Sequence, residues 1–360
     1  MNDATFMARA MQLARRGRFT TRPNPNVGCV IVQGHDIIGE GWHERAGGPH
    51  AEVVALKAAG TAAKDATVYV TLEPCSHHGR TPPCVDALIK SGVARVVIAM
   101  QDPNPQVAGA GMERLRAAGI EVETGLMEAE ARALNPGFVR RMEQGLPYVR
   151  LKLAASLDGR TAMASGESKW ITGEAARADV QRLRARSSAI VTGAGTVLAD
   201  NPSLTVRTEV ITDQPLRVVV DSHLSTPADA RIFTEPGTTL VVTASEDGEA
   251  ADQLVNAGAQ VLCLPSANHG VDLVALMKHL AGLQCNEVMI EAGSTLSGSA
   301  LACGIVDELV CYLAPHLMGS DAKGMFKLPE VVSMADRIAL EIFDVRAIGR
   351  DWRISARIVR

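Results

Sequence analysis

The feature that most constrains the fold is an alternation of short apolar, strand-like runs with helical stretches, which occurs twice and is interrupted once. Such an alternation is typical of layered α/β domains in which helices cover a sheet. The interruption lies at residues 140–147, where polar residues, a Gly and a Pro come together as they do in linkers. We therefore expect two α/β domains, residues 1–145 and residues 146–360.

The same pattern predicts individual elements. In the first domain we expect helices at residues 5–16, 51–59, 84–90 and 111–118, and strands at residues 27–32, 37–42, 68–72, 96–100 and 121–124. In the second domain we expect helices near 174–186, 271–281 and 296–302, and strands at 149–153, 189–192, 216–220, 239–243, 261–264, 288–290 and 309–313. Residues 352–359 are predicted as a final edge strand, and 208–215 and the rest of 321–360 carry no recognisable motif.

Three potential metal ligands occur in the first domain. His50 and Cys84 stand at the starts of predicted helices, and Cys75 follows a predicted strand. One His and two Cys supply the three protein ligands of a catalytic zinc, whose fourth position is left to water. Glu52, two residues after the His, can face the same pocket without binding the metal, and a proton-transferring Glu in this position is the pattern of zinc deaminases. The cluster therefore predicts hydrolytic deamination of an amidine-type ring carbon, with Glu52 moving the proton and ammonia leaving.

Two other interpretations of this cluster are open at this stage. A structural zinc module coupled to a nucleotide-sensing domain would need a fourth ligand, for which His77 and His78 are the nearby candidates, and would leave Glu52 without a role. A deaminase that edits nucleic acid such as tRNA, with an accessory second domain, would share the His-x-Glu core. The net charge of −4 and the 3% aromatic content weigh against a nucleic-acid partner.

Composition narrows the remaining classes. No apolar run approaches the roughly 20 residues of a membrane span, and the first residues do not form a signal peptide, so we expect a cytoplasmic protein with no membrane partner. Seven scattered Cys argue against a disulfide framework. We also expect a homo-oligomer that buries an exposed sheet edge.

The segment between the two Cys makes the prediction more specific. Eight residues separate Cys75 from Cys84, where the usual deaminase signature has two. This longer segment, together with residues 23–28 (PNPNVG) and 39–43 (GEGWH), resembles the bifunctional deaminase–reductase family of riboflavin biosynthesis. The resemblance implies a cytidine-deaminase-like three-layer domain with one zinc per chain. It also implies pyrimidine contacts from Asn24, His43 and Glu52, with Arg80 near the substrate phosphate.

Three segments of the second domain resemble the reductase half of the same family. They are residues 149–160, 193–207 and 288–296, and the last combines a strand, a small-residue turn and a helix start that suits a phosphate. The G-x-G-x-x-G fingerprint of a Rossmann domain does not occur in them. The resemblance implies a dihydrofolate-reductase-like fold, with Ala292 standing where the family would have Gly.

The resemblance also implies the ligands and the residues that contact them. NADPH would be bound by Ala154, Trp170, Thr196, Asp200, Ser222, Gly293, Ser294, Thr295, Leu296, Ser297, Gly298 and Ser299. The substrate, a small phosphorylated pyrimidine, would be bound by Lys152, Ser168, Arg184, Leu204, Arg207 and Glu291. The predicted function is deamination of diaminohydroxyphosphoribosylaminopyrimidine to 5-amino-6-(5-phosphoribosylamino)uracil, followed by NADPH-dependent reduction of the ribosyl group to ribityl.

Overall fold

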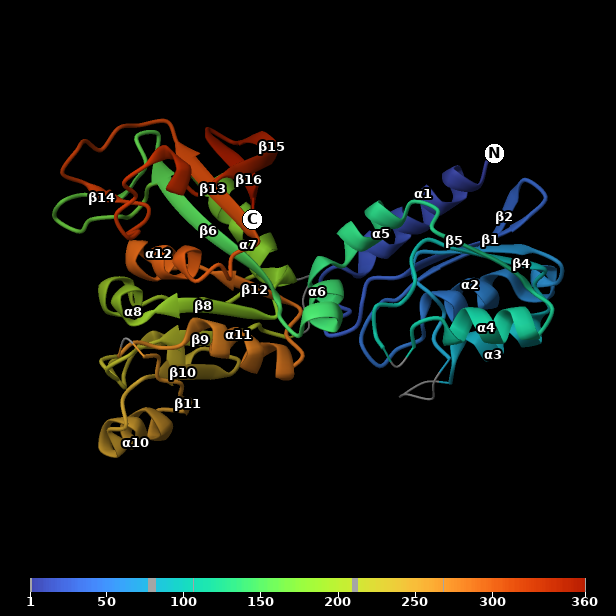
Figure 1. Cartoon of the computed structure of the whole chain (residues 1–360), viewed down its shortest axis with the longest axis horizontal. Helices are drawn as coiled ribbons and strands as arrows, with labels where there is room; N and C mark the ends of the chain where they lie inside the picture. The colour runs from blue at the N-terminus through green and yellow to red at the C-terminus, as the bar shows by residue number, and fades with distance from the viewer. Residues whose placement is uncertain (1, 77–81, 106, 209–212, 268, 360) are drawn as a thin grey trace. The chain divides into compact units, whose positions relative to one another are not determined.

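The chain forms two compact units, Met1–Gly145 and Leu146–Arg360, in a computed structural model. The structure describes every residue except 1, 77–81, 106, 209–212, 268 and 360 (Figure 1). None of the helices in these described parts is long and apolar enough to cross a membrane.

The first unit is built on a five-stranded sheet in the order β2-β1-β3-β4-β5. Strand β1 is antiparallel to both β2 and β3, whereas β3, β4 and β5 run parallel to one another. Their bounds are β1 Gly28–Gln33, β2 Asp36–Trp42, β3 Thr67–Val70, β4 Arg95–Ile98 and β5 Glu121–Thr124. The strands predicted for this domain are therefore present, with ends shifted by at most two residues.

Helices cover both faces of this sheet and produce three layers (Figure 1). One core contains apolar side chains of α2 (Ala51–Ala59), α3 (Cys84–Ser91) and α4 (Ala110–Ala117). The other contains those of α1 (Asp3–Ala14), α5 (Glu128–Leu134) and α6 (Pro136–Gln144). Short 3₁₀ turns occupy η1 (Arg15–Gly17) and η2 (Gly60–Ala63). The two core clusters place the starts of α2 and α3 on the same face of the sheet.

Two glycines allow α2 to lie unusually close to β2. A Cβ atom at Gly41 would overlap the carbonyl oxygen of Ala51 and come within 2.6 Å of the backbone nitrogen of Ala55. A Cβ at Gly39 would meet the backbone of the same helix in the same way, at the carbonyl oxygen of Ala55. The absence of these two side chains thus determines how near the first turn of α2 comes to the sheet.

The second unit is built on a nine-stranded sheet in the order β11-β10-β9-β8-β12-β6-β13-β16-β15. Neighbours from β11 to β13 run parallel, and the β13–β16 and β16–β15 pairs are antiparallel. The bounds are β6 Tyr148–Ser156, β8 Ala189–Gly193, β9 Leu216–Val220, β10 Thr239–Thr243, β11 Ala259–Cys263, β12 Glu287–Ile290, β13 Glu308–Ala314, β15 Leu340–Ile348 and β16 Asp351–Ile358. A separate pair is formed by β7 (Arg160–Ala162) and β14 (Lys323–Gly324).

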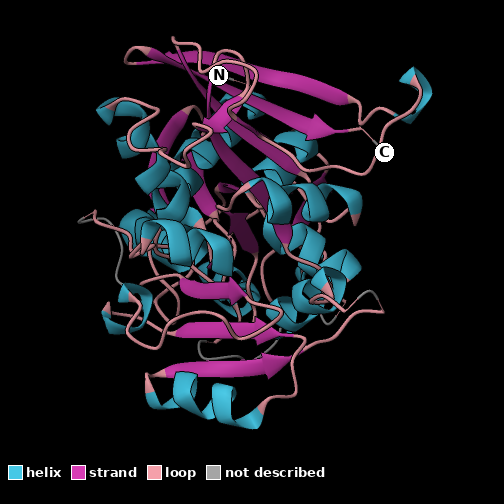
Figure 2. Ribbon diagram, turned by 90° about the vertical axis from the view of Figure 1, so that its left-hand side faces the viewer, coloured by secondary structure: helices cyan, strands magenta, loops and turns pink. Residues whose placement is uncertain are grey.

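Helices also lie on both faces of this second sheet (Figure 2). One core receives α11 (Leu273–Gly282) and α12 (Ser294–Ala302). The other receives α7 (Glu174–Arg186), α8 (Ala194–Asp200), α9 (Arg231–Thr234) and α10 (Gly248–Asn256). A 3₁₀ turn, η3, spans Met334–Asp336.

The prediction of a final edge strand at residues 352–359 was wrong about its place in the sheet. The strand exists as β16, but it lies between β13 and β15, and β15 forms the edge. Sequence reasoning missed β15 because its apolar side chains are exposed rather than buried, so it lacks a one-sided pattern.

Candidate active sites

The three predicted zinc ligands lie together in the first unit. His50 caps the start of α2, Cys84 is the first residue of α3, and Cys75 lies in the loop that follows β3. Their ligand atoms all lie within 4.8 Å of one another. Cys75 and Cys84 follow His50 in the sequence by 25 and 34 residues. The three side chains nevertheless meet, because α2 and α3 start on the same face of the sheet.

The distances between these ligand atoms are close to those around a zinc ion, with the His50–Cys84 separation about 0.5 Å shorter than in an ideal tetrahedral site. His50 Nδ1 lies 3.1 Å from Cys84 Sγ and 3.6 Å from Cys75 Sγ. A tetrahedral zinc with ordinary bond lengths separates a nitrogen and a sulfur ligand by about 3.6 Å. The backbone N–H of Cys84 also points at Cys75 Sγ over 3.3 Å, and such a donor stabilises a thiolate. The donor set of one imidazole and two thiols therefore suits zinc.

The electrostatics of the cluster favour a thiolate at Cys75. A hydrogen bond from Cys84, with a smaller contribution from His50, outweighs the opposing effect of burial and lowers the pKa of the Cys75 thiol to about 4. The same hydrogen bond, together with burial, raises the pKa of Cys84. The hydrogen bond to Cys75 raises the pKa of His50. The two sulfurs thus compete for one proton, which a bound cation would displace.

Glu52 lies in the first turn of α2 and is only 3% exposed. Burial raises the pKa of its carboxyl group, while the nearby His50 opposes that increase. A carboxyl group whose pKa is raised above its ordinary value holds a proton more readily, which suits a group that must both accept and release one during a reaction. Its position beside the Cys84 side chain puts this group at the metal cluster.

His43 and Asn24 adjoin the same cluster. The His43 ring lies 5.2 Å from the His50 ring, edge to face. His43 Nδ1 is 3.0 Å from the carbonyl oxygen of Pro49, which can only accept, so Nδ1 carries the proton. Its Nε2 therefore accepts from the side-chain amide of Asn24, at 3.0 Å. Burial lowers the pKa of His43, in keeping with a neutral ring. The fourth predicted substrate contact, Arg80, lies outside the described residues.

In the second unit, three predicted substrate residues form one ionic cluster. Glu291 accepts from Lys152 Nζ at 3.1 Å and from Arg184 Nε and Nη2, each at 3.0 Å. Burial opposes ionisation of Glu291, but Arg184 and Lys152 outweigh it and hold its pKa well below the ordinary value. Glu291 is therefore an anion clamped between two cations.

The other predicted substrate residues of this unit lie near the cluster to different degrees. Arg184 also donates to the carbonyl oxygen of Thr205, which brings the neighbouring Leu204 close to α7. The backbone of Arg207 donates to Gln181 of α7, and its side chain is exposed. Ser168 is half-buried in the segment after β7, without a described contact to Glu291. Thr205 was not predicted, since a backbone acceptor leaves no signal in the sequence.

Most of the predicted cofactor residues gather at one edge of the sheet. Ala154 lies near the carboxyl end of β6, Thr196 follows β8, Ser222 follows β9, and Gly293 follows β12. These strands are parallel, so their carboxyl ends share one edge, the usual place for a ligand in an open α/β sheet. The contact between Gly293 N and Thr196 Oγ1, at 3.3 Å, joins two of these segments.

The segment 293–299 begins α12 rather than forming an extended loop. Gly293 is the N-cap and has no side-chain cap, so the first backbone N–H groups of this nine-residue helix are available to a phosphate. Ser297 and Gly298 are buried instead, and a Cβ at Gly298 would overlap the backbone of Lys327. Ala292 is partly buried against the core, and its carbonyl accepts from Ser297.

The remaining predicted cofactor residues lie on flanking segments. Trp170 is 69% exposed, and the Arg177 guanidinium stacks 4.7 Å from its ring centre. Asp200, at the end of α8, pairs with Lys169 at 3.4 Å. Because Lys169 directly precedes Trp170, this ion pair brings the exposed indole close to the end of α8.

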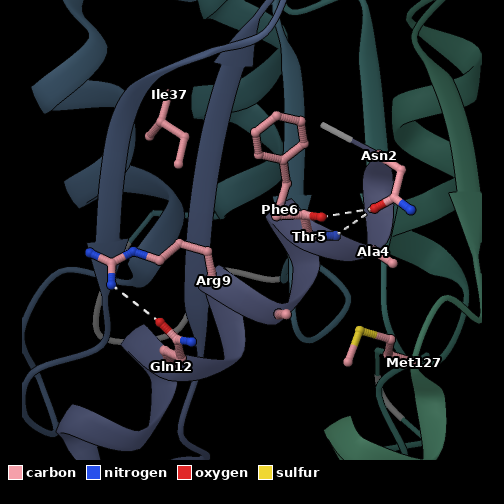
Figure 3. Close-up of a pocket in the computed structure, with 9 residues that line it drawn as sticks. Asn2, Ala4, Thr5, Phe6, Arg9, Gln12, Ile37 and Met127 are labelled. Atoms are coloured by element: carbon pink, nitrogen blue, oxygen red, sulfur yellow. Dashed lines mark hydrogen bonds between the residues drawn. The ribbon is translucent and has the colours of Figure 1, made fainter.

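A hollow of about 580 Å³ lies in the first unit, and the zinc ligands are not among its lining residues. It runs beside α1 and is lined by Phe6, Arg9 and Gln12, with Ile37 and Met127 at its sides (Figure 3). None of the predicted site residues lines it, and it opens over a helix flank whose polar groups bond to one another. We therefore do not assign it to either reaction.

Comparison with known proteins follows the same division into two parts. Residues 1–100 match the family described as "Cytidine and deoxycytidylate deaminase zinc-binding region", and residues 147–354 match the "RibD C-terminal domain". The riboflavin biosynthesis protein RibD of Escherichia coli K12 is 54% identical over 363 residues, covering 98% of each chain. The RibD of Haemophilus influenzae is 47% identical over 98% of this chain and 96% of its own.

Solved structures agree over almost the whole chain. Acinetobacter baumannii RibD (form 1) matches with a TM-score of 0.92 and 46% identity over 99% of each chain. A Thermotoga maritima protein described as a diaminohydroxyphosphoribosylaminopyrimidine deaminase/5-amino-6-(5-phosphoribosylamino)uracil reductase matches with a TM-score of 0.88 and 35% identity, over 99% of this chain and 98% of its own.

The fold and the sites define a bifunctional enzyme, a zinc-dependent deaminase joined to a reductase. The chain belongs to the RibD family of riboflavin biosynthesis proteins. The predicted α/β fold class and the predicted combination of deaminase and reductase are confirmed, and the editing-deaminase and structural-zinc alternatives are not favoured.

Proposed function

We propose that residues 1–145 deaminate diaminohydroxyphosphoribosylaminopyrimidine and that residues 146–360 then reduce the ribosyl group of the product with NADPH. The observation that carries the first step is the convergence of His50, Cys75 and Cys84 beside the buried Glu52. The observation that carries the second is the Lys152–Glu291–Arg184 cluster near the carboxyl ends of the parallel strands.

In the deaminase site, each side chain has a separate task. His50, Cys75 and Cys84 would hold the zinc, which when bound supplies the Lewis acidity that activates water. Glu52 would take a proton from the water whose oxygen bonds to the ring carbon, and would deliver it to the exocyclic nitrogen, so that the carbon–nitrogen bond breaks, ammonia leaves and a carbonyl remains. Asn24 and His43 orient the ring, since the hydrogen bond between them fixes the Asn24 amide and leaves its oxygen as an acceptor.

In the reductase site, NADPH supplies the hydride and the protein orients both reactants. The uncapped start of α12 and Thr196 bind the phosphates of the cofactor, and Trp170 and Ser222 contact its outer parts. Lys152 polarises the sugar group that accepts hydride, while Glu291 holds Lys152 in place. Because Arg184 is engaged with Glu291, we assign the substrate phosphate to the exposed Arg207.

A coupled assay on zinc-loaded protein tests both assignments. With the diaminopyrimidine ribotide and NADPH, we expect one ammonia and one NADPH oxidised per substrate. Glu52→Ala should release no ammonia, yet oxidise NADPH normally when the deaminated substrate is supplied. Lys152→Ala should show the reverse. Deamination by Glu52→Ala at near the wild-type rate would refute the proton-transfer assignment, and the exposed Glu113→Gln serves as a control.

We further propose that a second copy of the chain binds at β15. The outer edge of this nine-residue strand has no partner among the described residues, and Leu340, Ile342 and Val345 are 45–58% exposed. The pairing of Ala347 with Trp352 puts the exposed indole on the same face as these side chains. A long, apolar, unpaired edge is a site for strand pairing.

The charges of β15 favour an identical strand in the antiparallel direction. Glu341 and Asp344 precede Arg346 along β15, so a two-fold axis would put the acidic half of one strand beside the basic half of the other, in addition to the pairing of Asp344 with Arg346 within the strand. Light scattering should show a dimer, and Val345→Lys should convert it to a monomer. Val255→Lys, at an equally exposed position of α10, should leave the dimer intact. A monomeric wild-type chain would refute the proposal.

A further inference from the structure

The loop after β3 carries a buried carboxylate that the reaction does not use. Glu73 is 3% exposed, and its side chain accepts four backbone hydrogen bonds. Oε2 accepts from Asp102 at 3.1 Å and from Gly109 at 3.0 Å, whereas Oε1 accepts from Gly111 at 2.9 Å and from Met112 at 3.3 Å. One side chain therefore binds the start of α4 and the segment before it.

Helix α4 depends on this carboxylate because it has no cap of its own. Its N-cap is Gly109, which has no side chain to accept from the first N–H groups. A carboxylate supplied from elsewhere satisfies these donors and complements the positive end of the helix. Glu73 thus acts as a remote cap that ties α4 to the loop containing the metal ligand Cys75.

A second contact from α4 is made to Ser76, the residue that follows Cys75. Arg114 donates to the carbonyl oxygen of Ser76 at 2.8 Å, and it also pairs with Asp86 of α3. Cys75 therefore lies between two residues that α4 fixes, and the same helix is linked to α3, whose first residue is the ligand Cys84.

Close packing makes this attachment stiff. A Cβ at Gly111 would overlap the carbonyl oxygen of Pro74, so the first turn of α4 rests directly against the backbone next to the ligand. A displacement of the helix cannot be absorbed by a gap and must move the loop.

We propose that Glu73 and Arg114 are positioning residues through which α4 sets the place of the Cys75 thiolate. In this role they determine how tightly the zinc is held, and the inference rests on the zinc site of the proposed function. Partners that orient a metal ligand typically contribute about 10–100-fold in metal affinity or activity.

The first test is Glu73→Gln in the full-length, metal-loaded protein. The amide keeps the size of the side chain but replaces one acceptor with a donor that faces backbone N–H groups. We expect zinc transfer to a chelator to become at least about 10-fold faster. In the cobalt-substituted protein, the thiolate-to-cobalt absorption should weaken, which a general loss of stability would not cause in folded protein. NADPH oxidation of the deaminated substrate should not change.

The second test replaces Arg114, the exposed one of the two positioning residues. Arg114→Ala removes a surface side chain and should also speed zinc release, whereas Glu113→Gln on the same helix should not. If Glu73→Gln fails to fold, Arg114→Ala decides the question. Wild-type zinc release and cobalt absorption in the folded variants would overturn the inference alone. A wild-type protein that shows no thiolate-to-cobalt absorption would overturn the proposed zinc site as well.

Discussion

Replacing Gly41 with Ala tests whether the spacing between β2 and α2 controls deamination. The new methyl group would overlap the carbonyl oxygen of Ala51, the residue between the ligand His50 and the proton carrier Glu52. It would also lie 2.6 Å from the backbone nitrogen of Ala55. Since carbon contacts are comfortable only at about 3.5 Å or more, the first turn of α2 must move by about 1 Å.

The size of that displacement sets the expected effects. Overpacking of this kind costs about 1–3 kcal/mol of unfolding free energy. A misplacement of about 1 Å of catalytic groups can cost about 100-fold in rate. We therefore expect kcat/KM for ammonia release to fall about 100-fold in Gly41→Ala. NADPH oxidation of the deaminated substrate should stay at the wild-type level, because the second unit has its own core.

A matched control is Gly248→Ala, at the start of α10. A Cβ at Gly248 meets nothing within 4 Å, so this variant adds the same methyl group without a clash. Ammonia release by Gly41→Ala within about twofold of the wild type would refute the reasoning, since it would mean that α2 and its ligand can shift without consequence. A fall in both activities together would point to general unfolding instead.

Further predictions concern the second unit and the metal. Arg150 is 1% exposed and pairs with Glu287 and Glu308, each at 2.9 Å. Arg150→Met should therefore lower the unfolding free energy of this unit by about 3–5 kcal/mol, because it leaves two buried carboxylates without their partner. Urea titration measures this change, and an unchanged midpoint would contradict the prediction. Burial raises the pKa of Glu287, but Arg186 and Arg150 outweigh that effect and hold it at about 2, below its ordinary 4.5. The stability that this group contributes is therefore present above pH 4.5 and lost as the pH falls toward 2, and Glu287→Gln should flatten that part of the stability curve. Removing zinc with a chelator should stop ammonia release and spare NADPH oxidation, whereas loss of both would argue against separate sites.

The deaminase site could be predicted because each of its residues has a local signal. His50 and Cys84 begin helices, and Cys75 follows a strand, so their places in the fold follow from short stretches of sequence. The ionic cluster at Glu291 was accessible only through family resemblance. Its partners Lys152 and Arg184 are separated from it by 139 and 107 residues, and no local pattern links such distant positions.

Elements that break the usual patterns were missed. Strand β15 exposes its apolar side chains, so the rule that apolar faces are buried could not identify it. Helix α5 was not predicted, and residues 140–144 at the end of α6 lie where polar residues, Gly and Pro suggested only a linker. The support of Glu73 for α4 was also invisible, because backbone N–H groups do not appear in a sequence.

The order of strands in the second sheet has a consequence for how the enzyme is made. Strand β12 lies between β8 and β6, although it follows them in the chain by about a hundred residues or more. The centre of this sheet therefore stays open until residue 290 has been synthesised, whereas every strand of the first unit is present by residue 124. Because domains fold as units during synthesis, N-terminal first, we expect the nascent chain to acquire its deaminase fold while the middle of the reductase is still unmade.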